Sequence, residues 1–165
     1  MFTIYELFYL VGFYGFYMVA LIFAFHLVPL GLDAGTRWFA WFFFGAMLND
    51  ALNAALKEWI RDPRPTRCHE MQLRGAVDSV VGCRGSGHYG FPSGHAQLVF
   101  YALGFFYAWA RYQMTYGGLL AGFVAGLTLY QRWKFRRHTV EQLVAGSVVG
   151  LAFGMGFVWL GGRGR

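Results

Sequence analysis

The stretch Phe91-Pro92-Ser93-Gly94-His95 ends a polar, glycine-rich loop and begins the apolar run 96–110, which is predicted to form a helix. Pro92 and Ser93 are typical of a helix start, because proline loses no hydrogen bond in a first turn and serine can cap free N–H groups. The N-terminus of a helix attracts anions through those N–H groups and its dipole. His95 lies in the first turn, where it can give or take a proton beside a bound anion.

The composition indicates a membrane protein with a single domain, residues 1–165. Of the 165 residues, 57% are hydrophobic and 13% are charged, whereas about a quarter of a soluble domain is charged. Ten of the fourteen Lys and Arg residues lie in two clusters, at 57–84 and 132–137. The net charge of +6 is therefore better explained by phosphate recognition at one membrane face than by nucleic-acid binding.

The apolar pattern predicts an all-α integral membrane protein with about five transmembrane helices in a compact bundle. The first segment has no basic n-region and is too long for a cleaved signal peptide, so we expect a retained anchor. A tight turn at 31–36 is expected to reverse the chain before the second segment. The predicted spans are 7–30, 37–59, 93–112, 116–133 and 139–160.

The last two predicted helices each carry glycines four residues apart, which lets helices approach closely in lipid. We therefore expect these two helices to pack against each other. The glycines are Gly118, Gly122 and Gly126 in one helix and Gly146, Gly150 and Gly154 in the other.

The second predicted helix becomes polar toward its end, at Asn49, Asp50, Asn53 and Lys57. These four side chains are predicted to share one broad face. Charged groups at membrane depth are costly and normally face the protein interior or a wet cavity. The face either leads into an active site or holds a buried Asp50–Lys57 pair that only locks helices together.

With five spans, the polar loop at 60–91 and the segment 132–138 lie on the same side of the membrane. Cationic groups and two histidines thereby come to one face. Two arginines and a lysine around a helix N-terminus form a clamp for phosphate oxygens, and two histidines supply a nucleophile and a proton donor for phosphoryl transfer. No carboxylate cluster suits magnesium, so we expect neither a metal nor another cofactor. These residues are Lys57, Arg64, His95, Arg132 and His138.

Three motifs resemble the signature of the type 2 phosphatidic acid phosphatase superfamily. That signature is Lys-x6-Arg-Pro, then Pro-Ser-Gly-His, then Ser-Arg-x5-His-x3-Asp, and the match extends from about residue 50 to 150. The resemblance implies that His138 is the nucleophile that forms a phosphohistidine and that His95 protonates the leaving group. It also implies six spans, so that this chain lacks one at its N-terminus. The residues implied to bind phosphate are Lys57, Arg64, Ser93, Gly94 and Arg132.

Two positions depart from the signature. Gln131 replaces its serine, and Gln142 replaces the aspartate that would orient the nucleophile. The Gln142 carboxamide can accept the N–H of His138 and fix its tautomer without supplying charge. Glu141 is the alternative partner, but Gln142 shares a helical stripe with His138 and is preferred as the third catalytic residue.

The segments 89–97 and 138–142 resemble the dolichyl-diphosphate phosphatase branch, in which glutamine commonly follows a His-Thr pair. This implies a lipid substrate, a polyprenyl diphosphate, that is hydrolysed to the monophosphate. The alternatives are another lipid phosphate (phosphatidate, phosphatidylglycerol phosphate, a lipid A phosphate or undecaprenyl diphosphate) or a non-catalytic lipid-binding membrane protein. The oligomeric state is not predicted.

The side of the membrane on which the site lies is ambiguous from charge alone. The motif face carries most of the Lys and Arg residues, which by the positive-inside rule indicates the cytoplasm. The resemblance implies the lumenal or periplasmic face, and a Cys68–Cys83 disulfide would suit that oxidising side. We follow the resemblance. Two separate thiols are the alternative for Cys68 and Cys83.

Overall fold

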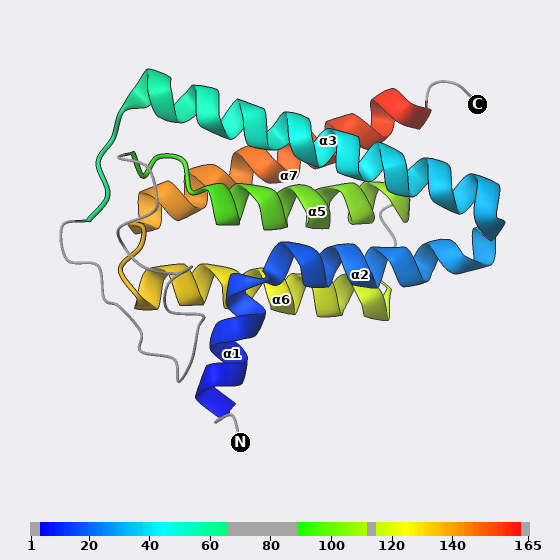
Figure 1. Cartoon of the computed structure of the whole chain (residues 1–165), viewed down its shortest axis with the longest axis horizontal. Coiled ribbons are helices and arrows are strands. Elements are labelled where there is room, and N and C mark those ends of the chain that lie inside the picture. Colours follow the sequence, from blue (N-terminus) through cyan, green and yellow to red (C-terminus); the bar gives the residue numbers. More distant parts are fainter. Residues whose placement is uncertain (1–3, 66–88, 112–114, 163–165) are drawn as a thin grey trace.

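The computed structural model describes residues 4–65, 89–111 and 115–162. In those residues the protein is a bundle of long helices that lie side by side, and a short first helix, α1, turns away from them (Figure 1). The elements are α1 (Ile4–Phe13), α2 (Gly15–Leu27), a 3-10 turn (Val28–Leu30), α3 (Gly31–Ile60), α5 (Gly94–Trp109), α6 (Tyr116–Lys134) and α7 (Val140–Gly162).

The first predicted span, 7–30, is not one helix. The chain bends at Tyr14, so that α1 crosses α6 while α2 joins the bundle (Figure 1). Two glycines allow this close approach: a Cβ on Gly12 would lie 2.7 Å from the Leu127 carbonyl oxygen, and one on Gly15 would collide with Thr128 Oγ1. The prediction of a single straight span was wrong because this packing, and not a proline, bends the chain.

The turn between α2 and α3 is tighter than expected. It consists of the 3-10 turn and Gly31, whose φ of 77° lies in the left-handed region that glycine adopts without strain. The residues predicted to form the turn at 31–36 already belong to α3, which runs for 30 residues. Asp33 in its first turn favours this start by opposing the helix dipole.

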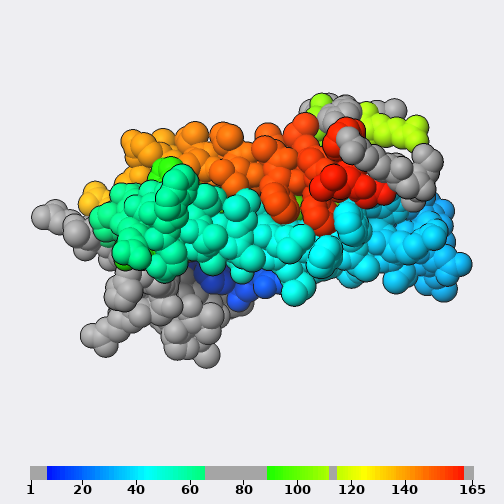
Figure 2. Space-filling view, turned by 90° about the horizontal axis from the view of Figure 1, so that it is seen from above, coloured from blue at the N-terminus to red at the C-terminus, as the bar shows by residue number. Residues whose placement is uncertain are grey.

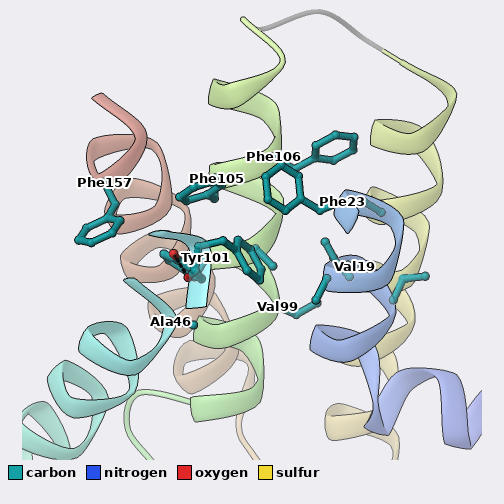
Figure 3. Close-up of a cluster of buried hydrophobic side chains, with 14 of the residues drawn as sticks. Val19, Phe23, Ala46, Val99, Tyr101, Phe105, Phe106 and Phe157 are labelled. Carbon is teal, nitrogen blue, oxygen red and sulfur yellow. Dashed lines mark hydrogen bonds between the residues drawn. The ribbon is translucent and has the colours of Figure 1, made fainter. Parts of the chain in front are cut away.

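The core of the bundle is aromatic. Phe23, Phe42 and Phe105 are fully buried and contact one another with ring centroids 5.2–5.4 Å apart. The close-up of the cluster labels Phe23 and Phe105 (Figure 3). Tyr101 is also buried, and its hydroxyl donates a 2.7 Å hydrogen bond to the Phe42 carbonyl. Tilted and edge-to-face ring pairs of this kind join α2, α3 and α5.

The glycines of α7 pack against α5 and not against α6. A Cβ on Gly146 would lie 2.5 Å from the Ser93 carbonyl, and Cβ atoms on Gly150 and Gly154 would collide with backbone oxygens of α5. By contrast, Gly122 and Gly126 of α6 face open space. The predicted pairing of the last two helices was therefore wrong, and α7 fills a place between α5 and α3, beside which it lies in Figure 2.

Two described stretches are long and apolar enough to cross a membrane by themselves. They are 15–60, which joins α2, the 3-10 turn and α3, and Val140–Gly161 in α7.

Candidate active site

The predicted motif residues gather at one end of the bundle. The C-terminal ends of α3 and α6 and the N-terminal ends of α5 and α7 all lie at this end (Figure 1). The acid candidate His95 has Lys57, Arg64, Arg132 and His138 as its electrostatic neighbours. The five side chains are spread over the sequence, and the fold brings them together.

Ser93 starts α5 as the sequence predicts. Its hydroxyl caps the helix by accepting a 3.5 Å hydrogen bond from the Ala96 amide. Its own amide donates a 2.9 Å bond to the backbone carbonyl of Gln142 in α7. The start of α5 is thus attached to α7, and Gly94 and His95 lie at the free N-terminal end of the helix.

Buried amides attach α3 to the same place. Asn53 Nδ2 donates to the Pro92 carbonyl at 3.2 Å and to Gln97 Oε1 at 2.8 Å, and Gln97 Nε2 donates to Asn49 Oδ1 at 3.0 Å. One turn after Asn53, Lys57 brings its Nζ within 3.5 Å of the point where a Cβ of Gly94 would lie. The amide network therefore holds the lysine against the helix start.

Asp50 does not share this inward face. Asn49 and Asn53 are buried, whereas Asp50 is exposed on the outer side of α3. The alternative of a buried Asp50–Lys57 pair that locks helices was therefore wrong. The hypothesis that the polar face leads toward the motif residues agrees with the positions of Asn49, Asn53 and Lys57.

The chain after α3 positions Arg64. The Arg61 backbone is left-handed, with a φ of 54°, and ends the helix. Gly90 then donates a 2.7 Å backbone bond to the Asp62 carbonyl, and Pro63 pairs with Tyr89. Arg64 Nε reaches the Tyr89 carbonyl at 3.5 Å, so both ends of the polar loop meet beside the site.

His138 is buried and its ring is held by Gln142. The distance from His138 Nδ1 to Gln142 Oε1 is 3.1 Å. Gln142 Nε2 donates to Asp62 Oδ2 at 2.7 Å and to the Pro63 carbonyl at 3.0 Å. Because both of these partners accept hydrogen bonds, the amide must turn its oxygen to His138. Nδ1 is therefore the protonated nitrogen, and Nε2 keeps its lone pair.

Gln142 thus occupies the position that the sequence analysis preferred over Glu141, whose side chain is exposed. The carboxylate behind the histidine belongs to Asp62, which the sequence analysis missed. The sequence contains little indication of Asp62. It lies two residues before Arg64, but its hydrogen-bond partner Gln142 is 80 positions away. Gly90 makes room for this contact, because a Cβ there would lie 2.6 Å from Gln142 Nε2.

The surroundings of His138 keep it neutral. Burial, followed by the positive charge of Arg64, lowers its pKa from 6.5 to about 3, although the hydrogen bond that His138 donates to Gln142 acts in the opposite direction. The pKa of Arg64 is itself lowered by burial and by the charge of Arg137. Cations therefore crowd one side of an uncharged imidazole, which is the arrangement expected where an anion binds.

Two of the Arg132 guanidinium nitrogens are unsatisfied within the described residues. It is 5% exposed, and its Nε and Nη2 atoms are buried without a hydrogen-bond partner among the described residues. Its guanidinium lies 5.1 Å from the centre of the Phe13 ring, which also approaches the His95 ring at 5.4 Å. Phe13 and the buried Arg137 are two residues at the site that the sequence analysis did not single out.

A cavity of about 740 Å³ opens beside His138. Its lining includes Pro65, Thr139 and Phe135, and the exposed cations Lys134 and Arg136. The histidine is thus reachable through a positively charged opening. The predicted Cys68–Cys83 pair lies outside the described residues, so the disulfide stays a prediction.

Comparison with known proteins identifies the family of the chain. The model of the PAP2 superfamily matches residues 38–164. Dolichyldiphosphatase 1 of Dictyostelium discoideum is 27% identical over 130 residues, which cover 72% of this chain and 49% of the relative. The chain therefore spans about half the length of that curated relative.

The fold is also similar to a solved structure, a transmembrane PAP2 type phosphatidylglycerolphosphate phosphatase from Bacillus subtilis. The TM-score is 0.67 at 17% sequence identity, and the match covers 97% of this chain and 77% of the other. The apolar helices, the fold and the matched family model together make the chain an all-α integral membrane protein that belongs to the PAP2 superfamily.

Proposed function

We propose that the protein is a metal-independent membrane lipid phosphatase that hydrolyses a polyprenyl diphosphate to the monophosphate through a phosphohistidine. The observation that carries the proposal is the pairing of His138 with Arg132. The imidazole is neutral and oriented by Gln142, and the buried guanidinium beside it has donors without a partner in the described chain. A terminal phosphate would satisfy those donors and present phosphorus to the histidine.

In the first step, His138 Nε2 attacks the terminal phosphorus, and the bond from phosphorus to the bridging oxygen breaks. His95 donates a proton to that oxygen, so that the lipid monophosphate leaves. Lys57, Arg64 and Arg132 hold the charge that develops on the phosphoryl oxygens, and Ser93 and Gly94 at the start of α5 complete the cradle. This positive charge is why no metal is needed.

In the second step, water attacks the phosphohistidine. His95, now neutral, takes a proton from the water, the bond from phosphorus to nitrogen breaks, and inorganic phosphate leaves. His138 Nε2 regains its lone pair, while the proton on Nδ1 stays hydrogen-bonded to Gln142 Oε1. The chain of Asp62, Gln142 and His138 thus keeps one tautomer through both steps.

A polyprenyl diphosphate is favoured as substrate by the relative named dolichyldiphosphatase and by the glutamine that follows the His-Thr pair. The opening beside His138, with Lys134 and Arg136 at its lining, also suits a head group with more than one phosphate. We place the site on the lumenal or periplasmic face, where such carrier lipids are released after glycan transfer.

The test is phosphate release by the purified protein in detergent with excess chelator. Dolichyl diphosphate, undecaprenyl diphosphate, phosphatidate and phosphatidylglycerol phosphate would be compared. We expect turnover that the chelator leaves unchanged and a preference for the diphosphates. His138→Ala should abolish it, whereas His26→Ala is the matched control, because His26 lies in α2, where its Nδ1 is 2.9 Å from the Ile22 carbonyl oxygen and its ring contacts Phe106. Equal activity of the His138→Ala variant and wild type would overturn the proposal.

A further inference from the structure

A second cavity lies next to the candidate active site, between α1 and α6. It has a volume of about 380 Å³, within the range of ligand pockets. Its walls are almost wholly apolar and its one carboxamide is that of Gln131. The lining residues are Phe8, Tyr9, Phe123, Leu127, Tyr130, Gln131 and Phe135. We call this cavity the α1–α6 groove.

Stacked aromatic rings connect the groove to the reacting groups. Tyr9 in the groove wall stacks on Phe13 at 6.4 Å and meets the edge of Phe135 at 4.8 Å. Phe13 in turn contacts the His95 ring and the Arg132 guanidinium. A molecule in the groove therefore lies one ring away from the histidine that is proposed to protonate the leaving oxygen.

Gln131 has a buried side-chain amide that is unsatisfied within the described residues. It is 2% exposed, and neither Oε1 nor Nε2 has a hydrogen-bond partner in the part of the chain that the structure describes. A buried amide that is left unsatisfied destabilises the fold. Gln131 directly precedes Arg132 and lines the groove, so a ligand that enters from the site can supply the missing bonds.

From these contacts we infer that the α1–α6 groove binds the hydrocarbon chain of the substrate next to its phosphates, and that Gln131 donates a hydrogen bond to the phosphate that is not transferred. The inference rests on the proposed function and deepens it. The leaving group carries the chain, so the chain must depart on the His95 side, where the groove begins. Gln131 and the groove would then select lipids that present an oxygen anion at the mouth and an apolar chain behind it.

Shape, and not hydrophobic burial, should determine this selection. A lipid chain is already surrounded by hydrocarbon in the membrane, so moving it into an apolar groove gains little. Filling the groove should instead exclude the chain and displace the phosphates from the site. In tight pockets, one misplaced methylene already changes kcat/KM by about tenfold or more.

The experiment compares undecaprenyl diphosphate with isopentenyl diphosphate, which has the same phosphates but almost no chain. Leu127→Trp fills the groove and should lower kcat/KM for undecaprenyl diphosphate by about tenfold, with less than twofold change for isopentenyl diphosphate. Val148→Trp is the matched control, because Val148 is exposed on α7. Equal losses on both substrates, or no loss on either, would contradict binding of the chain in the groove. Turnover of both substrates by the wild type would still support the proposed phosphatase activity.

A second variant separates ligand binding from a structural role. Gln131→Leu removes the unsatisfied amide, so the unfolding temperature should stay the same or rise. Its kcat/KM for both diphosphates should nevertheless fall by about tenfold, since both carry the phosphate that Gln131 is inferred to bind. A lower unfolding temperature with unchanged kcat/KM would show a structural role and overturn the assignment.

A binding readout that needs no turnover covers the case in which Leu127→Trp fails to fold. An undecaprenyl diphosphate analogue with a photoreactive group near the phosphates should label peptides that contain Phe8 or Phe123 in the wild type. Labelling confined to the cavity of about 360 Å³ at the α2–α3 turn, lined by Ala24, Gly35 and Phe39, would contradict the groove.

Discussion

The two ends of the helix bundle bury different kinds of side chains. Toward the α2–α3 turn, rings such as Phe23 and Phe105 fill the interior, and the buried Tyr101 hydroxyl has its hydrogen-bond partner. At the motif end the interior holds Gln131, Arg132 and His138, and donors of the first two lack partners among the described residues. Under the proposed function, an anionic ligand would supply the hydrogen bonds that the described residues of the motif end do not make.

This difference predicts which substitutions change the stability of the fold and which change turnover. Burying a satisfied hydroxyl or ring stabilises the fold, whereas burying an unpaired guanidinium costs stability that ligand binding can recover. Substitutions at the aromatic end should therefore change stability and leave turnover alone. Substitutions at the motif end should lower turnover and leave stability unchanged or higher.

Arg132→Met should give the largest difference between the effect on turnover and the effect on stability. We expect kcat/KM for a polyprenyl diphosphate to fall by about 10²-fold or more, because a donor that holds transition-state charge is lost. The unfolding temperature should not fall, because an unpaired buried charge is removed. Steady-state kinetics and thermal unfolding in detergent measure both. A strong loss of stability would show that Arg132 is part of the scaffold.

Asp62→Asn should lower kcat by about tenfold, a smaller effect. The variant weakens the 2.7 Å bond from Gln142 Nε2, so the carboxamide that fixes the His138 tautomer is held less firmly. Glu58→Gln is the matched control, because Glu58 is an exposed acid on the last turn of α3. Equal kcat values for the two variants would remove Asp62 from the site.

The pH dependence of stability should reveal the buried imidazole. The unfolded chain protonates His138 near pH 6.5, whereas in the folded protein its pKa is about 3. Between these values the unfolded state binds more protons, so stability should fall as the pH falls from 6.5 toward 3. The decline should be weaker in His138→Gln. Identical pH profiles of unfolding temperature would show that His138 titrates normally.

Tyr101→Phe should have the smallest effect and mark the other end of the bundle. Loss of the 2.7 Å bond to the Phe42 carbonyl should cost about 1 kcal/mol of stability. Phosphate release should be unchanged. If this variant lowered kcat as much as Asp62→Asn does, the two ends would be coupled, and the separation drawn between them would be wrong.

The sequence predicted that the motif residues lie together, because each motif contains its own helix-start or spacing signal. Ser93 caps α5 as expected, and the parity of the spans correctly brought Lys57 and His138 to one end. The preference for Gln142 over Glu141 agrees with the hydrogen bond to His138. The parts that failed depend on distant partners. Asp62 became visible only when the fold placed it 2.7 Å from Gln142.

The fold was predicted less completely, for a similar reason. Glycines four residues apart show that a helix can approach a neighbour closely, but not which neighbour, so Gly150 was assigned to α6 when it packs on α5. The bend at Tyr14 could not be predicted from a proline, because no proline lies near it in the sequence. It depends on Gly12 and Gly15 meeting α6, which a count of apolar residues cannot show.

The most direct test of the central claim is to trap the covalent intermediate. Undecaprenyl diphosphate labelled in its terminal phosphate would be mixed with the protein and quenched in alkali, in which a phosphohistidine survives. We expect the label on the peptide that contains His138, and none in His138→Ala. Turnover without a labelled protein, or a label that persists in His138→Ala, would contradict the assignment of His138 as the nucleophile.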